Sequence, residues 1–142
     1  MAVARKSIEI EASRETVFGV IADYESYPTL LKDMEGAVVN SRNDGIVEAT
    51  FSVNLIKRVS YTLRLEEKAP ETLRWSLVKG PFKQNDGGWT LHEIGPGRTR
   101  ADYQIELRVS GFVPRAISDR LVEGSLPALL QSVKSEAESR EG

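Results

Sequence analysis

PRAISDRLVEGSLPALLQSVKSEAESR, residues 114–140, is the one stretch of this sequence with the pattern of a long helix. Its apolar residues recur mostly at spacings of three to five, which is the stripe of an amphipathic helix. They are Ile117, Leu121, Leu126, Leu129, Leu130, Val133 and Ala137. An interior proline removes a backbone hydrogen bond and clashes with the carbonyl four residues before it. We therefore predict a kink or a bulge near Gly124 to Pro127, either as an imperfection of an ordinary core helix or as a feature that shapes a cavity beneath it.

The region from Ile46 to Val109 can supply a partner surface for that helix, because apolar and polar residues alternate along it with the period of a strand. Asn43-Asp44-Gly45 predicts a hairpin between residues 37–42 and 46–55. Further turns are expected at Ala69-Pro70, Gly87-Gly88 and Gly95-Pro96-Gly97. We expect an antiparallel meander with one buried face, whose inward residues are Val47, Ala49, Phe51, Val53, Leu55, Val59, Tyr61, Leu63, Leu65, Leu73, Trp75, Leu77, Trp89, Leu91, Ala101, Tyr103, Ile105, Leu107 and Val109.

The N-terminal residues predict a strand followed by two short helices. Val3 to Glu11 alternates as a strand, and Ser13 can cap a helix from Arg14 to about Ala22. Pro28 disfavours helical geometry at the residue before it and can begin a second helical turn. Strands that form one sheet, with helices at both ends of the chain, indicate an α+β architecture.

The composition is that of one globular domain. A chain of 142 residues without internal repeats predicts a single domain, residues 1–142. The net charge of -2 argues against binding to DNA through bulk charge. Cysteine is absent, which excludes disulfides and thiol catalysis and suits a reducing compartment. The N-terminus shows no apolar run of a signal peptide, so we expect a cytoplasmic protein.

Three motifs of this sequence resemble a known superfamily. They are Asp23-Tyr24-Glu25-Ser26-Tyr27-Pro28, Gly80-Pro81-Phe82-Lys83 and Gly87-Gly88-Trp89. With the order of the expected elements, they resemble the coenzyme Q-binding branch of the START and polyketide-cyclase (SRPBCC) superfamily. The resemblance implies a helix-grip fold, in which a seven-stranded antiparallel sheet wraps around a long C-terminal helix and two short helices follow the first strand. The same branch includes cyclase/dehydrase proteins and a bacterial group linked to ribosome association.

The candidate ligand-binding residues face the space between sheet and helix. Tyrosine and tryptophan present hydroxyl and indole donors on large apolar bodies, which suits a hydrophobic ligand with carbonyl groups. Core packing is the better explanation for any one of these aromatic residues, whereas ligand contact is the better explanation for the whole set. The candidates are Phe51, Tyr61, Leu63, Trp75, Trp89, Tyr103, Leu126 and Leu130.

The expected inward positions from Val47 to Val109 carry no Asp, Glu, Lys, Arg or His, so the sequence identifies no catalytic residue. His92 is the single histidine and should face solvent, because it shares the strand parity of Thr90. One histidine and no cysteine argue against a zinc or di-iron site. We expect no metal and no cofactor.

Three loops at one end of the meander should combine basic and apolar residues. Consecutive loops of a meander alternate between its two ends, so residues 54–58, 79–85 and 110–115 should share one end; they contain no Asp or Glu. Such an end suits an anionic membrane surface, near which each basic residue contributes ~1 kcal/mol. A solvated loop end that is basic by chance is the alternative. The candidate membrane or entrance residues are Leu55, Ile56, Lys57, Arg58, Phe82, Lys83 and Phe112.

The sequence thus predicts a protein that binds or transports a hydrophobic small molecule, such as a quinone, a lipid or a polyketide-like compound. Catalysis is not required for this function. A polyketide aromatase/cyclase is the alternative, in which tyrosine hydroxyls assist the folding of a reactive chain. A protein-interaction module of the ribosome-associated type is a second alternative.

Overall fold

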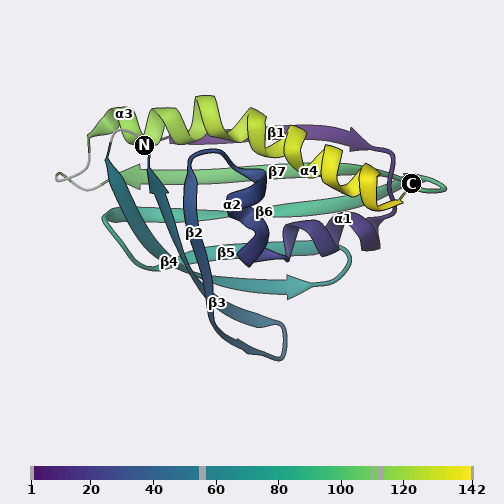
Figure 1. Ribbon diagram of the computed structural model, residues 1–142, viewed down its shortest axis with the longest axis horizontal. Coiled ribbons are helices and arrows are strands. Elements are labelled where there is room, and N and C mark those ends of the chain that lie inside the picture. The colour runs from purple at the N-terminus through teal and green to yellow at the C-terminus, as the bar shows by residue number, and fades with distance from the viewer. Residues whose placement is uncertain (1, 55–56, 110, 112–113, 142) are drawn as a thin grey trace.

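The computed structural model describes residues 2–54, 57–109, 111 and 114–141. Within these ranges, seven strands form one antiparallel sheet in the order β1-β7-β6-β5-β4-β3-β2 (Figure 1). Strands β2 to β7 therefore form a simple meander, and β1 pairs with β7 to complete the sheet. The strands are β1 Ala2–Ile10, β2 Met34–Asn43, β3 Ile46–Asn54, β4 Arg58–Lys68, β5 Thr72–Lys79, β6 Phe82–Gly95 and β7 Arg98–Val109.

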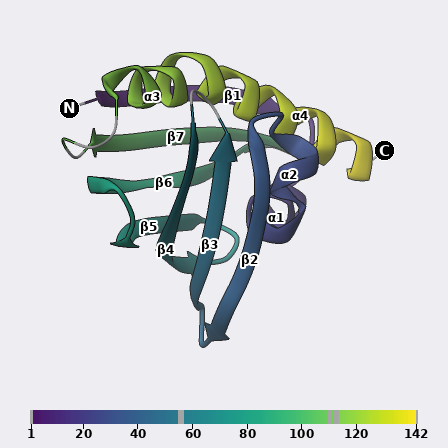
Figure 2. The same ribbon diagram turned by 60° about the vertical axis from the view of Figure 1, so that its left-hand side comes forward.

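The helices occupy one face of this sheet. The sheet curls, so that β2 and β3 stand steeply against β6 and β7, and the last helix runs along the curled sheet past β7 and β2 (Figure 2). That helix, α4, packs against α1 and β1. The helical elements are α1 Arg14–Ile21, the 3₁₀ turn η1 Tyr24–Ser26, α2 Tyr27–Leu30, α3 Arg115–Arg120, the π-helical segment η2 Leu121–Ser125 and α4 Leu126–Glu141. The α+β helix-grip fold with two short helices after the first strand is confirmed.

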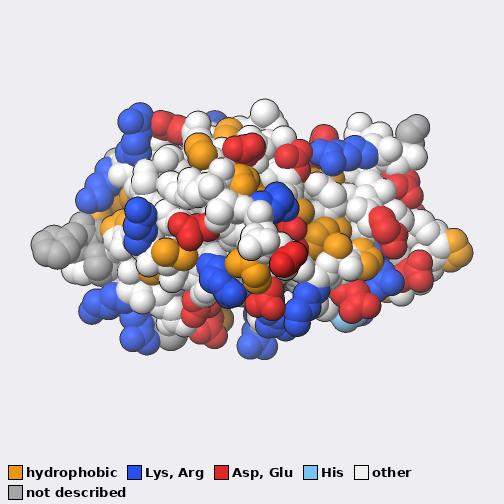
Figure 3. All heavy atoms as spheres, turned by 90° about the horizontal axis from the view of Figure 1, so that it is seen from below, with side chains coloured by type: hydrophobic (Ala, Val, Ile, Leu, Met, Phe, Trp, Pro, Cys, Tyr) orange, Lys and Arg blue, Asp and Glu red, His pale blue; other side chains and the backbone are white. Residues whose placement is uncertain are grey.

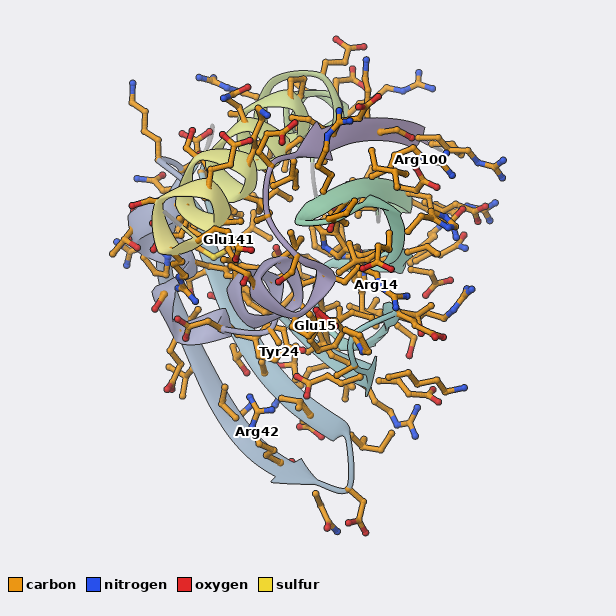
Figure 4. The ribbon with its side chains drawn as sticks, turned by 90° about the vertical axis from the view of Figure 1, so that its right-hand side faces the viewer. Arg14, Glu15, Tyr24, Arg42, Arg100 and Glu141 are labelled. Atoms are coloured by element: carbon orange, nitrogen blue, oxygen red, sulfur yellow. The ribbon has the colours of Figure 1, made fainter. Side chains whose placement is uncertain are left out.

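The C-terminal half of α4 is fixed to the connection between β1 and α1. Ser13 caps α1 as predicted, because its hydroxyl accepts a hydrogen bond from the Thr16 backbone N–H at 3.2 Å. The Thr16 hydroxyl donates in turn to Glu141 at 2.6 Å, and Figure 4 shows Glu141 at the end of α4. One turn earlier, the Glu138 carboxylate accepts from the Glu11 backbone N–H at 2.9 Å, and the ammonium of Lys134 donates to the carbonyl of Glu9 at 2.9 Å. These charge-assisted bonds hold this end of the helix in place.

The predicted bulge in the long helix is confirmed as the π-helical segment η2, which separates α3 from α4. Pro127 explains it, because in an unbroken α-helix this residue would leave the carbonyl of Glu123 without a donor and would clash with it. After the wider turn, Pro127 lies in the first turn of α4, where its missing N–H is not needed. The extra residue also changes which positions of α4 face the sheet.

The predicted apolar face of the sheet forms the core. Its fully buried strand residues are Val47, Ala49, Phe51, Val53, Val59, Leu63, Leu65, Leu73, Trp89, Leu91, Ala101, Tyr103 and Leu107. Partly buried Tyr61, Trp75, Leu77, Ile105 and Val109 pack against them. The expectation that this face has no acidic residue is wrong. Strand β4 continues to Lys68 instead of ending in a turn, so Glu67 has the inward parity of Leu65 and its side chain is 13% exposed.

The glycine pair Gly87-Gly88 is not the predicted turn but lies inside β6. A Cβ on Gly87 would lie only 2.6 Å from Cζ2 of Trp75, so the absence of a side chain lets the indole lie across the strand. Pairing between β5 and β6 is confined to residues 72–75 against 87–90. Beyond Trp75 the two strands separate, and the chain turns at Gly80-Pro81.

Candidate functional site

A cavity of about 450 Å³ lies between the sheet and the segment from Arg120 to Leu129. Its volume falls within the range of ~300 to 1,000 Å³ typical of small-molecule pockets. Its wall on the sheet side is mainly apolar and includes Phe51, Val53, Leu63, Leu65, Ile105 and Leu107. Because most of the wall is apolar, burial of a hydrophobic molecule is the interaction that this space favours.

Six of the eight predicted ligand-binding residues line this cavity: Phe51, Tyr61, Leu63, Trp75, Trp89 and Tyr103. Leu130 is not among the residues that line the cavity. It is buried in the core, and its neighbours Ala128 and Leu129 line the cavity. The apolar stripe contains both Leu129 and Leu130, so it does not determine which of the two meets the cavity. The side chain of Leu126 lies outside the described residues.

Rings in contact make up two parts of the wall. Tyr61 lies between Phe51, at a centroid distance of 5.8 Å, and Phe82, at 5.4 Å. Tyr103 likewise lies between Trp75, at 5.5 Å, and Trp89, at 4.7 Å. Such pairs contribute about 0.5–1.5 kcal/mol each beyond the area they bury. The rings that a ligand would meet are therefore held in place by their neighbours.

The inner part of the cavity also contains polar atoms that sequence reasoning missed. Asn85 is 4% exposed, and its side-chain carbonyl accepts from Nε1 of Trp75 at 3.2 Å. Tyr27 lines the cavity and donates its hydroxyl to the carbonyl of Ile21. The signal for Tyr27 was the motif Asp23 to Pro28. The signal for Asn85 was its strand parity with Trp89, which the predicted turn at Gly87-Gly88 concealed.

Two hydroxyl groups and one amide remain available to a ligand. Within the described ranges, the hydroxyls of Tyr61 and Tyr103 and the side-chain nitrogen of Asn85 have no hydrogen-bond partner. Burial raises the pKa of Tyr61 to about 12. Burial, reinforced by the neighbouring Tyr61 and Tyr27, also raises the pKa of Tyr103. Both phenols therefore stay protonated near neutral pH and can donate a hydrogen bond to an acceptor inside the cavity.

The cavity reaches the surface between two segments, which we call the mouth. One side of the mouth is Lys32 and Asp33, between α2 and β2, and the other is Arg120, Gly124 and Ser125. Lys32, Arg120 and Gly124 are exposed. The Ser125 hydroxyl donates to the Asp33 carboxylate at 3.4 Å, which links the two sides. Charged residues that line the cavity in the described part of the chain are confined to this mouth.

The mouth lies at the end of the sheet predicted to be basic. The backbone N–H of Asn54, at the end of β3, donates to the carbonyl of Asp33 at 2.8 Å. At the same end Asn54 pairs with Arg58, and Phe82 pairs with Val109. Figure 3 shows lysine and arginine side chains grouped at the left end of the molecule.

Two details of that end differ from the prediction. Phe82 is 5% exposed and packs against Tyr61, so it does not project from the loop. Arg58 forms an ion pair with Glu35 at 2.8 Å, so an acidic residue from β2 reaches this end. Lys57 and Lys83 are exposed, as expected. Leu55, Ile56 and Phe112 lie outside the described residues.

Tyr24, Glu67 and Arg42 form a polar cluster, of which Figure 4 labels Tyr24 and Arg42. The Tyr24 hydroxyl donates to Glu67 at 2.6 Å, and Arg42 donates to the same carboxylate at 3.1 Å. Burial and this hydrogen bond to Glu67 raise the pKa of Tyr24. None of the three residues lines the cavity, so the inward Glu67 is not a base for chemistry within it.

The outer face of the sheet carries a Ser, Asp and His cluster that lacks the geometry of a catalytic triad. Both the Ser7 hydroxyl, at 2.7 Å, and Nε2 of His92, at 3.0 Å, contact the carboxylate of Asp102. Nucleophilic catalysis needs the histidine between serine and aspartate, so that it can take the serine proton. The side chain of His92 is 41% exposed, which confirms its predicted outward orientation.

The fold, the apolar cavity and its few internal donors can be compared with known proteins. Residues 10–134 match the family described as polyketide cyclase / dehydrase and lipid transport. The chain belongs to this family. The match covers both walls of the cavity, from the end of β1 through most of α4.

Curated proteins similar to this chain include bacterial toxins. The persistence and stress-resistance toxin PasT of Escherichia coli O6:H1 is 25% identical over 95 residues, which are 66% of this chain and 60% of that protein. The ribosome association toxin RatA of Escherichia coli K12 is 24% identical over a segment of the same length and coverage. The chain thus matches about three fifths of the length of these two proteins.

Solved structures share nearly the whole fold. A START superfamily protein from Mycobacterium smegmatis superposes with a TM-score of 0.82 and 19% identity over 97% of this chain and 98% of that one. The ZhuI aromatase/cyclase from Streptomyces sp. R1128 superposes with a TM-score of 0.84 and 18% identity over 98% of this chain and 94% of that one. At these identities, the likeness establishes the fold alone.

None of the helices in the described ranges is long and apolar enough to span a membrane. The same part of the chain contains no cluster of three or more His, Asp or Glu side chains that could hold a metal ion.

Proposed function

We propose that this protein binds a hydrophobic small molecule in the cavity between the sheet and the C-terminal helix, and releases it unchanged. The observation that carries the proposal is the apolar cavity of about 450 Å³ with protonated tyrosine hydroxyls and no charged group in its interior within the described ranges. Membership of a family that includes lipid transport supports it. The cysteine-free sequence suits the reducing cytoplasm as the place of action.

The donors of the cavity favour a ligand with carbonyl oxygens. The hydroxyls of Tyr61 and Tyr103 and the amide of Asn85 can each donate one hydrogen bond without displacing a protein partner in the described residues. A quinone combines such acceptors with an apolar body, and polyketides and lipid esters do so as well. Each hydrogen bond from these donors to an acceptor on the ligand would contribute about 0.5–1.5 kcal/mol.

A fluorescence titration tests this proposal. Trp75 and Trp89 line the cavity, so a short-chain quinone such as decylubiquinone should quench their emission in a saturable way. The double change Tyr61→Phe with Tyr103→Phe keeps both rings and should weaken quinone binding about 5- to 150-fold, since each lost hydrogen bond contributes ~0.5–1.5 kcal/mol. Tyr24→Phe is the matched control, because Tyr24 does not line the cavity. Absence of saturable binding by quinone, fatty acyl and polyketide probes would rule the proposal out.

An aromatase/cyclase remains the second candidate function, because tyrosine hydroxyls and Arg120 line the cavity. Protonated phenols could orient the carbonyl groups of a reactive chain. In the described lining, Asp33 at the mouth is the one carboxylate that could act as a general base. Incubation with a poly-β-keto thioester separates the two functions. A cyclised product whose rate falls in Tyr61→Phe would favour the enzyme.

The toxin relatives suggest a third candidate, a ribosome-associated interaction module. A module that acts only through its surface needs no cavity, so the open interior favours ligand binding over this candidate. Sedimentation with purified ribosomes tests it directly. Stoichiometric association that does not depend on Tyr61 or Tyr103 would favour the module.

We also propose that the basic end of the molecule meets an anionic membrane, so that a ligand can pass between bilayer and cavity. The support is the position of the mouth at that end, beside exposed Lys79 and Lys83. Vesicles with phosphatidylserine should sediment the protein, and vesicles of phosphatidylcholine alone should do so less. Lys79→Glu with Lys83→Glu should abolish the difference, whereas Lys6→Glu with Lys68→Glu, equal in charge but outside this end, should preserve it. Equal loss in both pairs would refute a specific docking end.

A further inference from the structure

We propose that the mouth of the cavity is an anion-binding subsite, and that the ligand is a single-chain amphiphile whose head group is a carboxylate or a phosphate ester. The inference rests on the proposed binding function and adds the chemistry of the head group. The residues that carry it are Lys32 and Arg120, which come from opposite sides of the mouth and both line the cavity.

These two cations are available to a ligand. In the described part of the chain, neither Lys32 nor Arg120 takes part in an ion pair. Two other arginines differ in this respect, because Arg42 pairs with Glu67 at 3.1 Å and Arg58 pairs with Glu35 at 2.8 Å. Unpaired cations that share one cavity opening are the arrangement that a bound anion would satisfy.

Acidic groups near the mouth do not cancel this charge. Asp33 is the one carboxylate among the described lining residues, and it contacts the Ser125 hydroxyl at 3.4 Å. Asp119 and Glu123 are exposed neighbours on the helical side and do not line the cavity. Glu35 is occupied by Arg58. The described lining therefore carries a net charge of one positive unit, from two cations against one anion.

The interior determines which end of a ligand can lie at the mouth. An ionised head group would lose its hydration among Leu63, Leu65 and Trp89 without meeting a cation there. An apolar chain in the interior and a charged head at the mouth match the apolar wall and the two cations, and a carbonyl oxygen on the chain would also accept from Tyr61, Tyr103 or Asn85. Arg120 suits this role because a guanidinium can hold a carboxylate or a phosphate through two parallel hydrogen bonds.

Binding of three probes with the same chain measures the head-group contribution. Hexadecanoate, hexadecyl phosphate and hexadecanol, each below its aggregation concentration at pH 8, would be titrated against the intact protein by displacement of a fluorescent fatty-acid analogue. We expect at least one of the anions to bind about tenfold more tightly than the alcohol, since two exposed ion pairs contribute a factor of about two to five each. The better anion identifies the head group as carboxylate or phosphate.

Substitutions at the mouth test the assignment to these residues. Lys32→Gln with Arg120→Gln should remove the advantage of the anions and leave hexadecanol affinity unchanged, which also shows that the cavity is intact. Lys79→Gln with Lys83→Gln removes the same charge outside the lining. This variant should keep both the advantage of the anions and the affinity for hexadecanol. Asp33→Asn should strengthen anion binding, because it removes the opposing carboxylate and keeps the backbone carbonyl that accepts from Asn54.

The outcomes separate this inference from the proposed function. Equal affinity of the wild-type protein for the alcohol and both anions would overturn the anion subsite and leave ligand binding standing. An anion advantage that survives Lys32→Gln with Arg120→Gln would overturn the assignment to the mouth. Failure of all three probes to bind, while decylubiquinone still quenches Trp75 and Trp89, would overturn the single-chain amphiphile and leave the proposed function standing.

Discussion

Replacement of Gly87 by alanine should destabilise the protein and disturb the cavity at once. The added Cβ would lie 2.6 Å from Cζ2 and 2.9 Å from Cε2 of Trp75, and it would also meet the backbone carbonyl of Gln104. The indole must move toward the cavity, and its hydrogen bond to Asn85 at 3.2 Å should break. Overpacking costs about 1–3 kcal/mol and the lost hydrogen bond about 0.5–1.5 kcal/mol, so we expect the free energy of unfolding to fall by about 2–4 kcal/mol.

Urea denaturation followed by circular dichroism measures this change, with Gly36→Ala as the control. Gly36 is also a strand glycine, but a Cβ there would meet nothing within 4 Å. Its replacement should be neutral or stabilise by up to ~1 kcal/mol, since alanine restricts the unfolded chain. Binding of decylubiquinone should weaken in Gly87→Ala and not in Gly36→Ala. If the two variants unfold at the same urea concentration with equal slopes, the indole does not lie across Gly87 and the reasoning fails.

Three other changes are expected to have measurable effects. Ser13→Ala removes the cap that accepts from the Thr16 N–H and should lower the free energy of unfolding by ~1 kcal/mol in urea titrations. Above pH 10 the protein should lose stability, because burial raises the pKa of Tyr61 to about 12 and also raises that of Tyr103, so the unfolded chain ionises first. This stabilisation is complete below a pH of about 10, the pKa of an unperturbed tyrosine, and is lost as the pH rises through the pKa of the folded state. In urea titrations at increasing pH, the free energy of unfolding should fall less steeply in Tyr61→Phe than in the wild-type protein. Leu130→Ala should cost about 2–5 kcal/mol of stability and leave quinone affinity unchanged, since Leu130 is core and does not line the cavity; a larger effect on affinity than on stability would contradict this placement.

The sequence was sufficient for the sheet and for most of the cavity wall, because both depend on local periodicity. Phe51, Tyr61 and Leu63 alternate with polar residues along β3 and β4, so a single buried face also defines what faces the helix. Asn43-Asp44-Gly45 identified its hairpin because positive φ angles are needed there, and Asp44 and Gly45 have φ angles of 51° and 80°. Each of these features is decided within a few residues.

The features that were missed depend on irregularities of the backbone. A register shift between Phe82 and Gln84 changes the parity of β6, so that both Phe82 and Asn85 turn inward although they differ in strand parity. The interpretation of residues 79–85 as a loop placed Phe82 at an exposed tip. It also overlooked Asn85, which has the strand parity of Trp89 but precedes the glycine pair that was taken for a turn. Within α4, Leu130 is buried in the core while Leu129 lines the cavity, a difference between neighbours that the apolar stripe does not determine. The charges at the mouth depend on the approach of α3 to the connection before β2, a tertiary contact without any local pattern.

The C-terminal helix has two roles, which its π-helical segment separates. After η2, Val133 and Ala137 are 1% and 0% exposed, and the bonds of Lys134, Glu138 and Glu141 fix this half to the β1–α1 connection. The residues on the other side, from Arg120 to Ser125, form one side of the mouth, and among the described bonds Ser125 to Asp33 at 3.4 Å links them to the other side. Local stability follows the density of buried contacts and hydrogen bonds. The half from Val133 to Glu141 therefore maintains the fold, whereas a ligand that enters the cavity passes the segment from Arg120 to Ser125. Binding and stability can therefore be altered independently along a single helix, which is why Leu130 and Arg120 are informative positions to change.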